Sequence, residues 1–334
     1  MLDCVRIGMI GCGGNARGHM NSLREMASAS IVGVCDLQEN LANQMADGVV
    51  GEGDELPRPD VYTDHRRLLE RDDLDAIWIS VPVFAHGQLE LDVVDRGLPF
   101  LVEKPVARDM ETARTVEAAV KAKGLLTCVG YQLRYMSGAQ AAHEVLDGKR
   151  INLVVGQYWS GSGRGYRNSW PLQMAKSGGQ LCEQATHTFD MMRYLIGEVA
   201  AVTCRATTRV LDQIDCPDVT VTTLAFACGA LGSMTTTWAF DPADWSEANV
   251  LHILYEDKLL QWRSDQATLR AECETQPLSA PGQGIDEVFV AAVRASDGSG
   301  ILTDYSDAVR SLAISLAAND SFTADGKTIE LSQY

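Results

Sequence analysis

The chain carries a glycine-rich turn, Gly11-Cys12-Gly13-Gly14-Asn15-Ala16, directly after an apolar run. In this G-x-G-x-x-A pattern the first glycine permits a tight turn, the second lets backbone approach a pyrophosphate, and the small last residue lets a helix lie against a strand. Asp36 ends the next apolar run, 25 residues after Gly11. A carboxylate there hydrogen-bonds the adenosine ribose and repels a 2′-phosphate. The pattern predicts dinucleotide binding, with NAD favoured over NADP; a glycine turn beside a surface Asp is the alternative.

Charged residues follow a second apolar run, where Glu103, Lys104 and Pro105 come after Val102. A lysine in a partly desolvated site can hold a substrate hydroxyl and assist its deprotonation while hydride leaves the adjacent carbon. Earlier in the chain, Ser80, Pro82 and His86 close another run, and small residues there leave room for a cofactor ring. The alternatives are a strand-ending turn with a solvated ion pair, and a His86 that caps a helix or lies in the core.

A third group follows helical spacing, because Glu183, His187, Asp190 and Tyr194 stand at i, i+4, i+7 and i+11. On one helix over Gly179–Leu195 these residues share a face, and a carboxylate on either side of His187 can orient its imidazole for proton transfer. The alternative is an ion-paired helix face. No further ligand stands at zinc-like spacing, so we expect no metal site.

Aromatic residues gather around the glycine-rich run Ser160–Gly165, where Tyr158, Trp159, Tyr166 and Trp170 occupy a 13-residue stretch. Aromatic rings stack on the apolar faces of sugars, and a nearby arginine can hold hydroxyls or a carboxylate. Core packing explains the aromatic residues equally well.

The expected strands and helices that position these groups follow two different patterns, one in each half of the chain. Up to residue 128, short apolar runs alternate with helical stretches, which predicts right-handed βαβ crossovers and a parallel, doubly wound sheet. The carboxyl ends of such strands hold ligands, so Lys104 is expected to face a bound nicotinamide. The expected strands are Val5–Ile10, Ile31–Cys35, Ala76–Val81 and Pro99–Val102, and the expected helices are Ala16–Met26, Glu39–Ala46, Arg66–Arg71, Gln88–Arg96 and Met110–Lys123.

The second half, from residue 129 to 334, reads as consecutive strands joined by short turns, which predicts an open, mainly antiparallel sheet. The expected strands are Ile151–Ser160, Ala201–Val210, Val219–Ala227, Leu231–Ala239, Val250–Tyr255 and Lys258–Arg263. Helices over Gly179–Leu195, Asp286–Ala295 and Tyr305–Ala318 are expected to cover one face. The Thr-rich other face is either a subunit interface or solvated.

Composition restricts the partners. The 334 residues include 28 Lys and Arg against 45 Asp and Glu, a formal net charge of −17, whereas binding to nucleic acid or an anionic membrane needs clustered positive charge. The nine cysteines form no C-x-x-C pair and indicate free thiols in a reducing compartment. We see neither a signal-peptide pattern nor an apolar run long enough to span a membrane, so we expect a cytoplasmic protein.

Taken in order, these motifs resemble the glucose-fructose oxidoreductase / inositol dehydrogenase (Gfo/Idh/MocA) family. The matching residues are Ile10–Gly14, Cys35-Asp36, Val61–Asp64, Pro82 with His86, Glu103-Lys104-Pro105, Gly130–Tyr135 with Arg134, and Gly178-Gly179 through Glu183, His187 and Asp190. The resemblance implies an α/β protein with an N-terminal Rossmann domain over residues 1–128. A C-terminal α/β domain over 129–334 is built on the open antiparallel sheet, for substrate binding and oligomerisation.

The resemblance also implies roles for single residues. Lys104 is the expected catalytic lysine, His187 the acid/base histidine, and Glu183 the carboxylate that positions the substrate. Trp170 stands where the family often contacts its cofactor. Expected substrate contacts are Lys104, Arg134, Tyr166, Glu183 and His187, and expected cofactor contacts are the glycine turn (11–16), Asp36, Ser80, Pro82, His86, Glu103, Lys104 and Trp170. Glu183 departs from the more common Asp, and Val81 and Val83 replace the usual Thr and Asn.

The expected activity is oxidation or reduction of a sugar, a polyol or a related compound with NAD, in a homo-dimer or homo-tetramer formed through the C-terminal sheet. One alternative is a glycoside hydrolase or lyase that retains its NAD and oxidises the substrate only transiently at C3 before elimination. Another is a non-catalytic sensor of sugars or nucleotides, against which the presence of both Lys104 and His187 counts.

Overall fold

The computed structural model describes residues 2–50, 57–165, 169–240 and 248–334. Its contacts divide the chain into two compact units. Unit 1 comprises Met1–Ala107, Glu111–Gly130 and Gly284–Val309, and unit 2 comprises Arg108–Met110, Tyr131–Gln283 and Arg310–Tyr334. The segment Gly284–Val309 therefore groups with the N-terminal unit although it lies late in the sequence. The helix expected over Asp286–Ala295 to cover the second sheet packs in the first unit instead, which is a correction to the sequence prediction. The assignment of residues 1–128 to cofactor and 129–334 to substrate stays a prediction.

Unit 1 is a doubly wound parallel sheet, as the alternating sequence pattern predicts. Within the described residues it has six strands in the order β3-β2-β1-β4-β5-β6, and all neighbouring strands run parallel. The strands are β1 (Val5–Ile10), β2 (Ala29–Cys35), β3 (Asp60–Tyr62), β4 (Ala76–Ile79), β5 (Phe100–Val102) and β6 (Thr127–Val129). The helices are α1 (Gly14–Arg24), α2 (Glu39–Val50), α3 (His65–Leu69), α4 (Gln88–Asp95), α5 (Met110–Lys123) and α12 (Ile285–Ala295).

The central strands of this sheet are apolar because helices cover both faces. Every residue of β4 and β5 is buried. The edge strands β3 and β6, of three residues each, were not predicted from the sequence.

The segments that follow β1, β4 and β5 are tied together at the carboxyl edge of the sheet. The backbone N–H of Ser80 donates to Ile10 O (2.8 Å), and that of Glu103 donates to Ile79 O (2.9 Å). One strand further, Gly130 N–H donates to Val102 O at 2.9 Å. These bonds continue the parallel ladder past the strand ends, so the glycine turn, Ser80 and Glu103 leave the sheet side by side.

Unit 2 is built on a mostly antiparallel sheet. Among the described residues it has nine strands in the order β14-β13-β12-β11-β7-β10-β9-β8-β15. These are β7 (Ile151–Trp159), β8 (Val199–Thr207), β9 (Val219–Phe226), β10 (Leu231–Thr237), β11 (Asn249–Tyr255), β12 (Lys258–Arg263), β13 (Gln266–Ala271), β14 (Glu274–Leu278) and β15 (Ile329–Glu330). The sequence pattern did not predict the last three. It predicted β7 as a strand but not its pairing: β7 lies parallel to β10 in the middle of the sheet, and hairpin signals report only neighbours in the chain.

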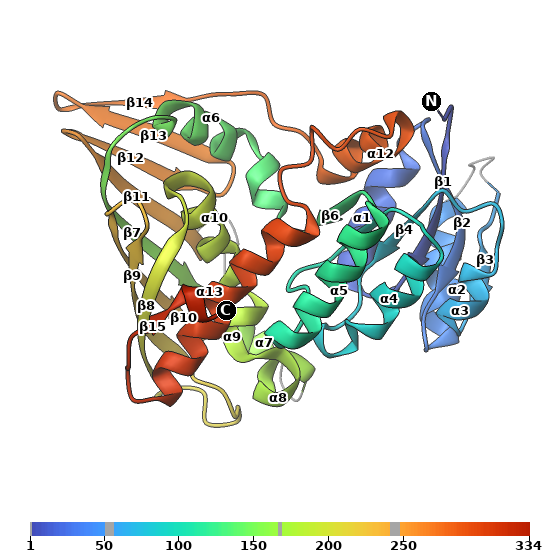
Figure 1. Ribbon diagram of the computed structural model, residues 1–334, viewed down its shortest axis with the longest axis horizontal. Helices are drawn as coiled ribbons and strands as arrows, with labels where there is room; N and C mark the ends of the chain where they lie inside the picture. The colour runs from blue at the N-terminus through green and yellow to red at the C-terminus, as the bar shows by residue number, and fades with distance from the viewer. Residues whose placement is uncertain (1, 51–56, 166–168, 241–247) are drawn as a thin grey trace. The chain divides into compact units, whose positions relative to one another are not determined.

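Helices cover one face of the second sheet. The helices of this unit are α6 (Ser137–Leu146), α7 (Ser162–Gly165), α8 (Met174–Ser177), α9 (Gly179–Glu183) and α10 (Thr186–Ile196), and α13 (Tyr305–Thr323) continues into it from unit 1. Figure 1 shows α6 and α10 on the same face, and both contact its strands. Gly138 of α6 allows this packing, because a Cβ there would lie 2.4 Å from the backbone of Asp265.

The single helix expected over Gly179–Leu195 is instead two helices, α9 and α10, which is a correction to the sequence prediction. Gln184 interrupts the helix with a φ of −125°. Its Oε1 accepts hydrogen bonds from the hydroxyls of Tyr158 and Ser162. The strand β7 and the turn after it therefore hold Gln184 where the helix would otherwise continue.

No helix in the described parts of the chain combines the length and apolar character needed to cross a membrane. All nine cysteines lie in those parts and are free thiols.

Candidate functional site

The glycine turn has the backbone that its pattern predicts. Gly11 has a φ of +91°, and a Cβ on it would lie 2.1 Å from the carbonyl oxygen of Ser80, so only glycine fits. At Gly13 and Gly14 a Cβ would meet nothing within 4 Å, so the space over the turn is open. Ala16 is fully buried, as expected for the small residue that brings α1 against the sheet. The turn therefore leaves room for a ligand at the start of α1.

Asp36 lies beside the turn, as its position at the end of β2 predicts. Its carboxylate accepts hydrogen bonds from the backbone N–H of Cys12 (2.9 Å) and of Gln38 (2.8 Å). The neighbouring thiols are inert. Burial, together with the charge of Asp36, raises the pKa of both Cys12 and Cys35 to about 12. The polar groups presented at this edge are thus backbone N–H groups and one carboxylate.

His86 is held by a buried carboxylate after β4. Its Nδ1 lies 2.5 Å from Oε1 of Glu90, and the other oxygen of Glu90 accepts the backbone N–H of Gly87. The side chains of His86 and Glu90 are 1% and 0% exposed. Among the residues that the structure describes, Nε2 of His86 is buried and has no hydrogen-bond partner. Because buried polar atoms are nearly always hydrogen-bonded, this unpartnered nitrogen is an exception.

Glu103 and Lys104 follow β5 at the same edge. The carboxylate of Glu103 is buried, and its Oε2 accepts the backbone N–H of Lys104 at 3.2 Å. Gly130 lies against this carboxylate, since a Cβ on it would be 2.8 Å from Oε2. Glu103 therefore does not form the solvated ion pair that was the alternative prediction.

The counter-charge of Glu103 is His19, a residue of α1 that sequence reasoning missed. Nε2 of His19 lies 3.1 Å from Glu103 Oε1, and its Nδ1 lies 2.7 Å from Asp286 Oδ1 on α12. The indole N–H of Trp78 on β4 donates to the same Asp286 oxygen at 2.7 Å. Burial alone would lower the pKa of His19, but the two carboxylates outweigh it and raise the pKa to about 10. His19 is thus a buried imidazolium.

In unit 2, His187 and Glu183 are both buried, at 2% and 9% exposure. They lie on opposite sides of the helix break, His187 in the first turn of α10 and Glu183 at the end of α9. The ring of Tyr131 packs edge-on against the imidazole of His187, with centroids 5.9 Å apart. The Tyr131 hydroxyl lies 2.9 Å from Thr186 Oγ1, and burial raises its pKa well above the usual range, which keeps this hydroxyl protonated.

Asp190, expected on the same face as His187, is part of a buried ion pair. Nη2 and Nε of Arg134 donate to its two oxygens at 2.6 and 2.8 Å, and Ser311 Oγ donates to Oδ1 at 2.5 Å. Arg134 also lies over the ring of Tyr194, 5.0 Å from its centroid. These contacts fit the ion-paired face that was the alternative prediction, and the role of Arg134 in binding substrate stays a prediction.

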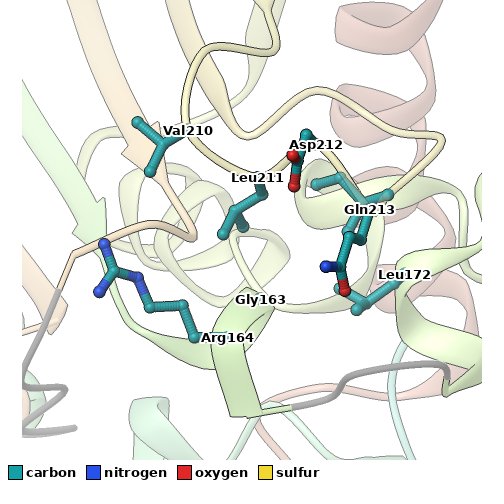
Figure 2. A pocket seen from close by; sticks show the side chains of 8 residues that line it. Gly163, Arg164, Leu172, Val210, Leu211, Asp212 and Gln213 are labelled. Carbon is teal, nitrogen blue, oxygen red and sulfur yellow. The ribbon is translucent and has the colours of Figure 1, made fainter.

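A cavity of about 230 Å³ lies in unit 2 beside the predicted aromatic segment. Figure 2 shows Arg164, Asp212 and Gln213 around it, with Leu172 and Val210 among the apolar lining. The lining is completed by Gly163, Leu211 and Ile214. Trp170, a predicted cofactor contact, begins the short helix Trp170–Leu172, whose last residue lines this cavity. Tyr166, a predicted substrate contact, lies outside the described residues.

The structure thus brings the unit 1 residues to one edge: the glycine turn, Asp36, Ser80, Pro82, His86, Glu103 and Lys104. Lys104 belongs to unit 1 and His187 to unit 2, and their convergence stays a prediction. Glu90 was missed although it stands at i+4 from His86. His19 and Asp286 gave no sequence signal, because 267 residues separate them.

Comparison with protein families gives two matches. A model described as an oxidoreductase family with an NAD-binding Rossmann fold matches residues 5–131, and one described as the GFO/IDH/MocA C-terminal domain matches residues 139–256. The chain belongs to the Gfo/Idh/MocA oxidoreductase family. The match confirms the resemblance drawn from the motifs and extends it to the C-terminal sheet.

Two curated members of the family show how far this sequence has diverged from its relatives. Inositol 2-dehydrogenase 4 of Saccharopolyspora erythraea is 28% identical over 204 residues, covering 60% of this chain and 57% of that protein. The scyllo-inositol 2-dehydrogenase (NAD(+)) of Bacillus subtilis is 27% identical over 238 residues, covering 69% of this chain and 66% of that protein. The matched stretches therefore span only about half to two thirds of the length of these relatives.

Solved structures agree in fold over nearly the whole chain. A levoglucosan dehydrogenase in complex with NADH superposes with a TM-score of 0.84 at 20% identity, covering 98% of this chain and 99% of that chain. The WlbA dehydrogenase of Bordetella pertussis, in complex with NADH and UDP-GlcNAcA, gives a TM-score of 0.83 at 21% identity, covering 98% of each chain. At this level of identity the likeness shows the fold.

Proposed function

We propose that the protein is an NAD-dependent oxidoreductase that transfers hydride between nicotinamide and a hydroxyl-bearing carbon of a sugar, polyol or sugar derivative. One observation carries the proposal. The carboxyl ends of three adjacent parallel strands present an open glycine turn, a buried histidine and the Glu103-Lys104 segment side by side. In doubly wound sheets this edge is where dinucleotides bind.

The residues at this edge fit NAD. The backbone N–H groups at the start of α1 suit a pyrophosphate, because Gly13 has no side chain that could cap them and no acidic residue stands in the first turn. The buried Nε2 of His86 supplies a hydrogen-bonding atom for a bound group. Asp36 supports NAD over NADP, since its carboxylate would repel a 2′-phosphate.

When bound, the nicotinamide supplies a hydride acceptor. The chain supplies the proton chemistry. Lys104 holds the substrate hydroxyl through its ammonium group, which favours the developing alkoxide. His187, or Lys104 where it is the neutral amine, takes the hydroxyl proton as the C–H hydride leaves, and Glu183 accepts a hydrogen bond from a second hydroxyl and orients the sugar. The family resemblance assigns Trp170 to the cofactor and Tyr166 to the substrate, and Tyr166 lies outside the described residues.

The relatives named above support the substrate class, since they act on cyclic polyols and anhydrosugars by name. We further propose a homo-dimer or homo-tetramer formed through the uncovered face of the second sheet. Large apolar side chains are exposed along that face, and they are Leu153, Val155 and Trp159 of β7, Val221 of β9, Leu231 of β10 and Leu254 of β11. Exposed apolar groups on this scale favour association. A cytoplasmic location is proposed from the nine free thiols.

The test is an NADH-detected assay over a panel of inositols, anhydrosugars and glycosides with wild type, Lys104→Ala and His187→Asn. Lys104→Ala is expected to lower kcat at least 1,000-fold while the Kd for NAD changes a few-fold. Full activity in Lys104→Ala would refute the mechanism. Release of an aglycone from glycosides without net NADH would instead establish the redox-assisted hydrolase or lyase. Tight NAD binding without turnover on any compound would indicate a sensor.

A further inference from the structure

Lys104 has little freedom in its main chain, because its N–H is held by the side chain that precedes it. Glu103 Oε2 accepts that N–H at 3.2 Å. Gly130 leaves room for the Glu103 carboxylate on one side, and Oε1 faces His19 on the other. The carboxylate is buried, so it needs a counter-charge to stay ionised in this position. His19 is the cation that the structure places beside it.

His19 is bonded to carboxylates through both ring nitrogens, at 3.1 Å to Glu103 and 2.7 Å to Asp286. A neutral imidazole donates from one nitrogen only, so His19 can donate to two ionised carboxylates only as the imidazolium. Asp286 is in turn fixed by the Trp78 indole N–H at 2.7 Å. The four side chains form one buried network with no solvent-exposed member.

This network touches three of the segments that form the proposed cofactor edge. His19 lies on α1, the helix that begins at the glycine turn. Trp78 lies on β4, two residues before Ser80, and Glu103 directly precedes Lys104. The network therefore sets the position of the lysine main chain relative to the start of α1, where a pyrophosphate would bind.

We propose that His19 is a positioning residue for Lys104: through Glu103 it holds the lysine in register with the phosphate-binding start of α1. The proposal rests on the proposed function for the role of Lys104, but the network itself belongs to unit 1. Loss of His19 leaves Glu103 buried without its cation, and the carboxylate then turns away or takes up a proton. If the carboxylate turns away, Lys104 N–H loses this acceptor, and if it takes up a proton, the bond to Lys104 N–H is weakened. In both cases the ammonium group is held less firmly beside the reacting hydroxyl.

His19→Gln tests the proposal, with His65→Gln as the matched control. His65 also pairs with an aspartate, Nε2 to Asp92 Oδ2 at 2.8 Å, but it joins α3 to α4 and contacts none of the proposed machinery. We expect His19→Gln to lower kcat at least tenfold, with KM and the Kd for NAD within threefold of wild type. His65→Gln should leave all three unchanged.

A second readout does not depend on turnover. The chain has seven lysines, so reductive methylation with ¹³C-formaldehyde gives few NMR signals, and that of Lys104 is assigned by its loss in Lys104→Ala. The Lys104 signal is expected to shift or broaden in His19→Gln and to stay in place in His65→Gln. An unmoved signal overturns the proposal even if kcat falls, because His19 would then act without Lys104.

Trp78→Phe covers the case in which His19→Gln does not fold. It keeps an aromatic ring facing Phe289, where the ring centroids are 5.1 Å apart, and removes the N–H to Asp286 together with the second ring of the indole. A two- to fivefold fall in kcat with a displaced Lys104 signal supports the proposal, and no change in either overturns it. If wild type turns over no polyol, the proposed function fails, whereas the NMR comparison still decides the position of Lys104.

Discussion

The two units bury their charges in different ways. In unit 1, the imidazolium of His19 lies between Glu103 and Asp286. In unit 2, the guanidinium of Arg134 forms a bidentate ion pair with Asp190. An imidazolium can lose its proton within the working range of proteins, whereas a guanidinium does not. The charge of His19, in the network next to Lys104, therefore depends on pH. The charge of Arg134, which pairs with Asp190 of α10, does not.

The largest effect is expected from breaking the ion pair between Arg134 and Asp190. Asp190→Asn leaves Arg134 buried without a counter-charge, which should lower the free energy of unfolding by about 3–5 kcal/mol. Arg205→Met serves as the control, because its partner Asp325 is exposed and a surface pair contributes about 0–1 kcal/mol. Urea unfolding of both variants measures the contrast. Equal losses would show that burial does not govern the Arg134 pair.

Next in size is the contrast between two glycines of one turn. Gly11→Ala places a Cβ 2.1 Å from Ser80 O at a positive φ, so we expect a loss of about 1–3 kcal/mol in unfolding free energy. Gly13→Ala meets nothing within 4 Å and should keep its stability. Both should weaken NAD at least tenfold, Gly13→Ala because its methyl enters the space for the pyrophosphate. Calorimetry measures the NAD affinity of the two variants, and thermal unfolding measures their stability. Unchanged NAD affinity in Gly13→Ala would contradict the cofactor site.

The pH dependence of stability should separate the two units. Folding raises the pKa of His19 from about 6.5 to about 10 through Asp286 and Glu103. A raised pKa means that the stabilisation is complete below pH 6.5 and is lost as the pH rises through 10. We therefore expect the Tm difference between wild type and His19→Gln to shrink from pH 6.5 to 10. Asp190→Asn should show no such slope, and a constant His19→Gln difference would argue against the imidazolium.

The smallest expected effect concerns Glu183. Glu183→Asp shortens the side chain by one methylene and should change the ratio of kcat/KM between two polyols by about tenfold, roughly 1.4 kcal/mol. Its Tm should stay within about 2 °C, since a change below about 0.5 kcal/mol shifts Tm little. Parallel kinetics on myo-inositol and levoglucosan provide the measurement. Equal losses on both would mean that Glu183 does not choose between hydroxyls.

Short local patterns predicted well, as the glycine turn illustrates. Gly11, Asp36 and Ala16 took the places that their spacing implied, because a tight turn after a strand has few backbone solutions. The polar stripe in unit 2 predicted less well. A single interruption at Gln184 separates Glu183 from the helix that carries His187, and helical spacing does not foresee a side-chain contact with β7.

What the amino-acid sequence determined by itself was the parallel sheet of unit 1, the glycine turn at its carboxyl edge and the family, since each depends on patterns within a few dozen residues. The tertiary structure alone decided the partners of the buried charges. His19 meets Asp286 across 267 residues, and Arg134 meets Asp190 across 56. Such pairs form because a buried charge must find whichever opposite charge the folded chain brings near, and periodicity in the sequence does not record that choice.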